Sequence, residues 1–311
     1  MNDTRVQIKK RMNAMSDSAA PGASAEPKTP VFSADLLFED LGQVARLTLN
    51  RPTVKNALSI GLSDDLIRAF NYLRDTERFK VVVITGAGNT FCAGDDLTEM
   101  ADGAWGQDTH QVMRRVRLYQ RMADTLDELD KITISAVDGY CVGGGLELTM
   151  ACDLVICTER ARWGMPEVDW GITPGWGGTT RMARLIGRRL TKEINMLGAL
   201  HSARRGFDLG MFNRVVANDA LESETGKLVD LLLMKNQHGL RQLKFVINNN
   251  VEADLKTAQA FEVMGAGVTM GIRAFPPADS DANHGWPSYK ARSAESLSRK
   301  RREAAIDFWT D

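Results

Sequence analysis

A carboxylic acid follows a turn made almost entirely of glycine. The segment Val-Gly-Gly-Gly-Leu-Glu at 142–147 lies between a strand-like segment, 132–137, and a helix-like segment, 148–153. Glycine lets a backbone turn sharply and approach a ligand closely, where a β-carbon would interfere. The first N–H groups of a helix have no partner inside it, so they can stabilise a developing oxyanion. The sequence therefore indicates an oxyanion site beside Glu147, and a plain strand-to-helix turn is the alternative.

Two further segments favour an oxyanion site over a plain turn. Phe-Cys-Ala-Gly-Asp-Asp-Leu at 91–97 follows the strand-like segment 81–86 and offers a second backbone N–H. A second glutamate, Glu167, lies in the segment 163–171, which leads into Pro-Gly-Trp-Gly-Gly-Thr at 174–179. Two N–H donors and two carboxylates from separate strand ends would make a reaction centre.

In this order and at these distances, the three segments resemble the crotonase (enoyl-CoA hydratase/isomerase) superfamily over roughly residues 35–270. The resemblance implies an α/β fold, a crotonase-like spiral of repeated ββα units with a C-terminal helical trimerisation region. It also implies an acyl-CoA thioester as substrate, coenzyme A only as part of that substrate, no other cofactor, and a homotrimer or hexamer.

The same resemblance assigns roles in the reaction. It implies that the N–H groups of Ala93 and Gly144 bind the thioester oxygen, and that Glu147 and Glu167 are the catalytic carboxyls. Two carboxyls that share a water repel each other when both are ionised, so the pKa of one should be raised. One can then accept a proton from water while the other supplies the proton taken up at C2. This pattern favours hydration of an enoyl-CoA.

Further substrate contacts carry over from the family. Backbone groups of the loop 50–58 are expected to reach the CoA nucleotide, and Asp96 is expected to serve structure rather than proton transfer. A lysine that relatives often place after this aspartate is absent, since 97–99 are Leu-Thr-Glu, so Arg51, Lys55 or the basic C-terminus should contact the phosphates. The complete predicted set of substrate contacts is Lys55, Ala57, Leu58, Ala93, Gly94, Asp95, Asp96, Gly144 and Trp170.

Other activities of this superfamily stay open. Gly175 stands where dienoyl isomerases carry an aspartate, which counts against that reaction. Trp163, Trp170 and Trp176 would suit a bulky planar acyl group, as in hydroxycinnamoyl-CoA hydratase-lyases, or could all be core residues. An isomerase, a thioester hydrolase, and a crotonase-fold binding protein that contacts RNA through 299–302 are further alternatives.

The segment 101–127 is predicted to be a loop followed by an amphipathic helix that covers the acyl group. Apolar residues recur there at helical spacing, and loops in this place shape substrate preference within the family. Trp105 and Tyr119 are therefore either substrate contacts or packed aromatic residues.

Composition restricts the partners and the chemistry. The 311 residues are 43% hydrophobic and carry a net charge of −1, which gives no overall attraction to nucleic acid or to an anionic membrane. The four cysteines form no C-x-x-C pair, and none of the four histidines lies in a motif. We therefore expect reduced cysteines, no metal and no membrane span, and a cytoplasmic protein, or one of the mitochondrial matrix if the source is eukaryotic.

Four regions are predicted along the chain. Residues 1–31 are a tail too poor in large apolar groups to fold, and 32–218 form the spiral core. Helices over 219–273 form the oligomerisation region, and 274–311 form a loop and a basic helix.

Overall fold

The structure, a computed structural model, describes residues 27–274 as two compact units, the first ending at Thr225 and the second beginning at Gly226. The predicted N-terminal tail up to residue 26 and the predicted C-terminal loop and basic helix from residue 275 lie outside the described residues.

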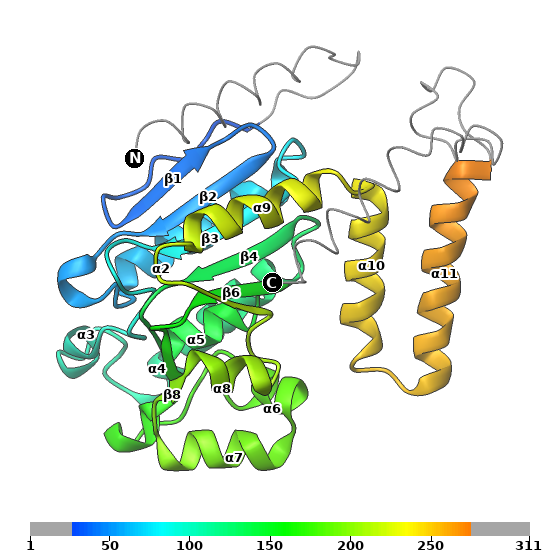
Figure 1. Ribbon diagram of the computed structural model, residues 1–311. Helices are drawn as coiled ribbons and strands as arrows, with labels where there is room; N and C mark the ends of the chain where they lie inside the picture. The colour runs from blue at the N-terminus through cyan, green and yellow to red at the C-terminus, as the bar shows by residue number, and fades with distance from the viewer. Residues whose placement is uncertain (1–26, 275–311) are drawn as a thin grey trace. The chain divides into compact units, whose positions relative to one another are not determined.

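A six-stranded sheet forms the centre of the first unit. Its first two strands make an antiparallel hairpin, and each later strand joins in parallel, in the order β1-β2-β3-β4-β6-β9 (Figure 1). All six residues of β4 are buried, as expected for a strand covered on both faces. The strands are β1 Leu36–Asp40, β2 Val44–Leu49, β3 Val81–Gly86, β4 Ile132–Val137, β6 Leu154–Thr158 and β9 Arg214–Val216.

Helices connect the parallel strands, as crossover units require. Helix α2 (Ile60–Asp75) begins at Ser59, whose hydroxyl accepts the Leu62 N–H at 3.1 Å. Its apolar face, including Leu66 and Leu73, is completely buried. Helix α2 therefore packs one apolar face into the core.

A smaller sheet lies beside the glycine turn. It comprises β5 Tyr140–Val142, β7 Arg162–Gly164 and β8 His201–Ser202. Cys92 extends this pairing, because its N–H donates to the Tyr140 carbonyl at 2.9 Å and its carbonyl accepts the Val142 N–H at 3.0 Å. The segment that follows β3 is thereby attached to the strand that enters the glycine turn.

The remaining elements are mostly short. Helix α5 (Gly144–Thr149) starts inside the glycine turn, and Glu167 lies in the 3-10 helix η2 (Pro166–Trp170). The others in the first unit are η1 Pro52–Val54, α3 Leu97–Ala101, α4 Thr109–Asp127, α6 Thr180–Ile186, α7 Arg188–Leu197 and α8 Ala203–Asp208.

Helix α9 (Leu221–Leu233) runs from the first unit into the second, which continues with α10 (Gln237–Asn250) and α11 (Leu255–Ala274). Helices α10 and α11 pack side by side through Phe245 and Phe261, whose ring centroids are 5.9 Å apart (Figure 1). No helix within residues 27–274 is both long and apolar enough to cross a membrane.

Candidate active site

The glycine turn and the loop after β3 meet in direct backbone contact. Gly94 has a φ of +95°, and a β-carbon there would lie 3.1 Å from the Val142 carbonyl oxygen and 3.4 Å from the Gly144 nitrogen. Both its φ and this close approach require glycine. The contact places Asp95 next to the first residue of α5.

At this contact, the N–H groups of Asp95 and Gly144 have no backbone partner in the part of the chain that the structure describes. The Ala93 N–H donates to the Lys55 carbonyl at 3.0 Å, so the prediction that Ala93 supplies a donor is wrong. Leu58 bridges the same loop, since its N–H donates to the Gly94 carbonyl and its own carbonyl accepts the Asp96 N–H. This pairing leaves the Asp95 N–H without a partner among the described residues, and the Gly144 N–H has none there either.

Glu147 lies in the first turn of α5 and is 1% exposed. Its Oε1 accepts the backbone N–H groups of Trp176 and Gly178, each at 2.7 Å. Burial raises the pKa of the Glu147 carboxyl, and backbone N–H groups of 176–178 oppose that rise. The Pro-Gly-Trp-Gly-Gly segment therefore holds this carboxyl in one orientation.

Glu167 approaches the glycine turn from η2. Its Oε1 would lie 2.9 Å from a β-carbon on Gly143, which is a glycine with φ of +54°. Its Oε2 is buried without a hydrogen-bond partner in the described part of the chain. Burial raises the pKa of Glu167 to about 7, its own backbone N–H opposes the rise, and the nearby charge of Glu147 adds to it. Glu167 is thus able to carry a proton near neutral pH.

Asp95 adds a third carboxyl to this group. Its Oδ1 is buried, has no partner among the described residues, and would lie 3.4 Å from a β-carbon on Gly144. Burial raises its pKa well above the usual range, and the charges of Glu147 and Glu167 raise it further. The sequence predicted Asp95 as a substrate contact but not as a titrating partner of the two glutamates.

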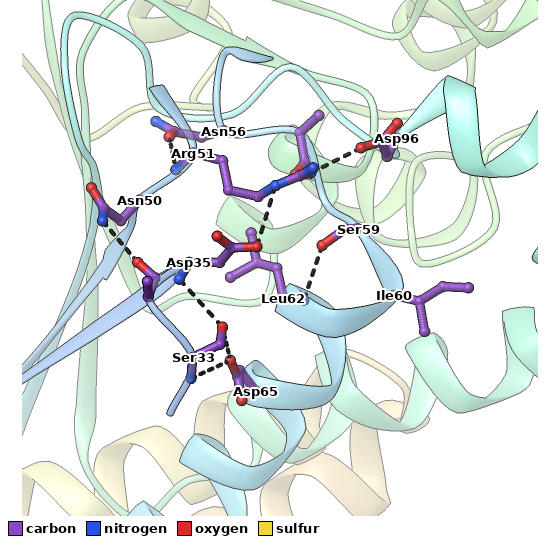
Figure 2. Close-up of polar contacts among 12 residues, drawn as sticks. Ser33, Asp35, Asn50, Arg51, Asn56, Ser59, Ile60, Leu62, Asp65 and Asp96 are labelled. Carbon is purple, nitrogen blue, oxygen red and sulfur yellow. Dashed lines mark hydrogen bonds and ion pairs between the residues drawn. The ribbon is translucent and has the colours of Figure 1, made fainter. Parts of the chain in front are cut away.

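The loop before α2 is held by Arg51. The Arg51 guanidinium contacts the Asp96 carboxylate at 2.9 Å, the Ala57 carbonyl at 2.6 Å and the Asp35 carboxylate at 3.4 Å (Figure 2). Asp96 also accepts the Thr98 N–H at 3.1 Å, which starts α3. These contacts give Asp96 a structural position, and they engage Arg51 within the protein itself.

The other predicted nucleotide contacts adjoin the oxyanion loop. Lys55 has an exposed side chain, and its Nζ lies 4.8 Å from the centroid of the Tyr140 ring. Its backbone is left-handed, with φ of 54°, and its carbonyl accepts the Ala93 N–H. Ala57 and the buried Leu58 follow directly. Of the two loop cations, Lys55 is the one that faces solvent.

The three tryptophans do not form one wall. Trp163 is buried in the core, where its Nε1 donates to the Ser202 carbonyl at 2.9 Å. The Trp170 side chain is 63% exposed, and its contact with substrate stays a prediction. Only Trp176 adjoins the oxyanion turn, since its Cη2 would lie 3.3 Å from a β-carbon on Gly144.

Tyr119 packs against Trp176, and Trp105 packs against Tyr119. The Tyr119 ring centroid lies 4.8 Å from that of Trp176 and 5.2 Å from that of Trp105. Both residues are buried in the protein. Within residues 27–274, no group of three or more His, Cys, Asp or Glu side chains is arranged to hold a metal ion.

Comparison with known proteins agrees with this geometry. The enoyl-CoA hydratase/isomerase family matches residues 39–270. The short-chain-enoyl-CoA hydratase of Clostridium acetobutylicum is 32% identical over 229 residues, which cover 73% of this chain and 86% of that protein.

Solved structures show the same relationship. The enoyl-CoA hydratase of Bacillus anthracis superimposes with a TM-score of 0.73 at 28% identity, covering 86% of this chain and 97% of that one. A Thermobifida fusca structure in complex with CoA gives 0.72 at 29% identity, covering 78% and 95%. With its mixed α/β fold and its paired glutamates, the chain belongs to the enoyl-CoA hydratase/isomerase family, the crotonase superfamily.

Proposed function

We propose that this protein is an enoyl-CoA hydratase that adds water across the 2,3 double bond of an acyl-CoA thioester. The observation that carries the proposal is the convergence of the buried Glu147 and the half-buried Glu167 on a glycine turn whose Gly144 N–H has no partner among the described residues. Relatives named as short-chain-enoyl-CoA and crotonyl-CoA hydratases support the reaction.

The thioester oxygen would be bound by the N–H groups of Asp95 and Gly144. Addition of water at C3 moves negative charge onto this oxygen, and donors fixed by the fold stabilise that charge without reorganising. In other enzymes, the loss of one such donor raises the barrier by about 2.7–4 kcal/mol. The backbone contact at Gly94 holds the two donors together.

The two glutamates would divide the proton transfers. Glu147, whose carboxylate is held by backbone N–H groups, accepts a proton from water as the oxygen adds to C3. Glu167, whose pKa of about 7 keeps a proton available, donates it to C2 of the enolate. The water hydrogens and oxygen are thereby accounted for, and exchange with solvent restores the starting protonation of the pair.

The loop 50–58 would bind the CoA moiety, with Lys55 near its phosphates and the backbone of Ala57 and Leu58 near the nucleotide. The fixed position of the loop, held by Arg51 and Asp96, supports this assignment. A Thermobifida fusca relative in complex with CoA and another in complex with acetoacetyl-CoA support a CoA thioester as the ligand.

We further propose a homotrimer, or a hexamer of two trimers, in the cytoplasm or in the mitochondrial matrix of a eukaryote. Apolar side chains exposed on α10 and α11 support an oligomer, because such surface is usually covered in soluble assemblies. They include Leu243, Ile247, Val263 and Met264. Light scattering during size-exclusion chromatography measures the assembly directly.

Mass spectrometry of the product tests the proposed reaction. Incubation with crotonyl-CoA should yield a thioester heavier by one water. An unchanged mass with a shifted double bond would make the protein an isomerase, and release of free CoA would make it a hydrolase.

A further inference from the structure

Besides Glu167 Oε2, the buried atoms Asp95 Oδ1 and Trp105 Nε1 around the oxyanion turn have no hydrogen-bond partner among the described residues. The Tyr119 hydroxyl faces the Ser63 hydroxyl, and a hydroxyl both donates and accepts, so it can make a further hydrogen bond. A buried polar atom that stays unsatisfied destabilises the fold, so folded proteins seldom leave several together. A bound ligand that supplies the missing partners explains such a group.

These atoms belong to one continuous cluster next to the reaction centre. Asp95 Oδ1 and the Trp176 indole both approach Gly144. The Tyr119 ring stacks on Trp176 at 4.8 Å, Trp105 packs on Tyr119 at 5.2 Å, and the Asp95 charge acts on the Tyr119 hydroxyl. The cluster therefore starts where the thioester oxygen would bind and extends along the packed aromatic side chains.

The chemistry of the cluster favours an uncharged oxygen as its partner. An indole N–H only donates, and burial raises the pKa of the Tyr119 hydroxyl to about 12, so this group keeps its proton. Burial and the charges of Glu147 and Glu167 likewise favour the protonated, donating form of Asp95. A carboxylate on the acyl group would bring a second negative charge close to the ionised Glu147, which costs energy.

We propose that Asp95, Tyr119 and Trp105 bind a hydroxyl or keto oxygen on the acyl group, so that the preferred substrate is an oxygenated enoyl-CoA rather than a plain alkyl one. This inference rests on the proposed hydratase function. Asp95 is the specificity-determining residue, because its side chain starts beside the oxyanion donors and its neutral carboxyl both donates and accepts. A site built to bond a substrate hydroxyl discriminates strongly against the analogue that lacks it.

Binding and turnover of a matched six-carbon series test the inference separately. Calorimetry compares the Kd of hexanoyl-CoA with that of thioesters hydroxylated at C4, C5 or C6 and with a carboxylate-terminated adipyl-CoA. The corresponding 2-enoyl-CoAs give kcat/KM. We expect at least one hydroxylated thioester to bind about tenfold or more tightly than hexanoyl-CoA, and adipyl-CoA to bind worst.

Variants test whether Asp95 and Tyr119 cause the preference for hydroxylated thioesters. Asp95→Ala and Tyr119→Phe should reduce the hydroxyl-to-alkyl ratio of Kd values towards one, whereas Asp95→Asn, which still donates and accepts, should keep most of it. Tyr72→Phe is the control, because the buried Tyr72 hydroxyl already has Thr29 as a partner. Circular dichroism shows whether each variant is folded.

The outcomes separate the two proposals. Equal Kd values for the alkyl and all hydroxylated thioesters, or tightest binding of adipyl-CoA, would overturn the inference even if every enoyl-CoA is hydrated. A hydroxyl preference that Asp95→Ala and Tyr119→Phe leave unchanged would overturn it as well. Selective binding without hydration would instead refute the hydratase function and leave the recognition of oxygen supported.

Discussion

The carboxylate of Glu147 accepts the backbone N–H of Trp176 at 2.7 Å, while the indole of the same tryptophan lies against Gly144. One residue therefore orients a catalytic carboxyl and closes the space beside an oxyanion donor. The segment that carries Trp176 is as much a part of the active site as the glycine turn.

Replacing Glu147 by glutamine should separate catalysis from folding. The glutamine oxygen can still accept both N–H groups, but the amide cannot take a proton from water, so kcat should fall by about 10²–10⁴ with little change in Tm. Glu147→Ala should lose activity and also stability, by about 1–3 kcal/mol for each N–H left unpaired. Urea unfolding and the hydration rate measure the two effects. Equal stability of the two variants would contradict the role of these hydrogen bonds.

The activity should depend on the protonation of Glu167. Because its pKa is raised to about 7, the fraction that carries a proton falls as pH rises through 7, and kcat/KM for hydration should fall with it. The apparent pKa of this limb belongs to the coupled carboxyls jointly. Glu167→Gln should be slower by about 10²–10⁴ and should lack this limb. A Glu167→Gln profile parallel to that of the wild type would assign the limb to another group.

The same raised pKa should lower stability as pH increases. Since the folded state holds the Glu167 proton more tightly than the unfolded state does, folding is favoured at low pH, and this contribution is lost between the unfolded pKa of 4.5 and about 7. Chemical unfolding at pH 5 and pH 8 should show a smaller difference for Glu167→Gln than for the wild type. An unchanged difference would show that Glu167 titrates normally.

A methyl group on Gly144 should obstruct the oxyanion site. Its β-carbon would lie 3.3 Å from both Leu58 and Trp176 and 3.4 Å from Asp95, tighter than ordinary packing, although the φ of Gly144 is not left-handed. We expect Gly144→Ala to fold and to lose about tenfold or more in kcat/KM. Gly226→Ala is the control, because its β-carbon would meet no atom within 4 Å in a helix. It should gain up to about 1 kcal/mol of stability and keep full activity.

The ion pair between Arg51 and Asp96 should affect substrate binding more than chemistry. Asp96→Asn weakens the contact that holds the loop 50–58 but leaves the carboxyls of the site in place, so KM should rise several-fold with a smaller change in kcat. Asp75→Asn removes an exposed pair with Arg74 and should change neither constant. A fall in kcat alone for Asp96→Asn would contradict a purely structural role.

The sequence predicted the elements with strong periodicity and the residues that motifs identify. The strand over 132–137, the helix within 101–127 and the approach of Glu147 and Glu167 to one turn all agree with the expectations. They were predictable because spacing along the chain determines which face of a helix or strand is apolar. A run of glycines, in turn, indicates a sharp turn or a close approach to a ligand.

The backbone N–H of the loop 91–97 that would bind the thioester oxygen could not be predicted in this way. Which N–H of the loop 91–97 stays unpaired depends on its partners Lys55 and Leu58, which lie more than thirty positions earlier in the chain. The exposure of Trp170 likewise depends on how η2 lies on the surface, which composition does not reveal. The unpartnered atoms of Asp95 and Trp105 become visible only once the packing is known.

The central claim is that two glutamates hydrate an enoyl-CoA. The most direct test follows the loss of enoyl-thioester absorbance for the wild type, Glu147→Gln and Glu167→Gln, with crotonyl-CoA and the hydroxylated six-carbon enoyl-CoAs. Hydration by the wild type, and a loss of at least about a hundredfold in each folded variant, would support the account. No hydration by the wild type, or a variant that retains most of its rate, would contradict it.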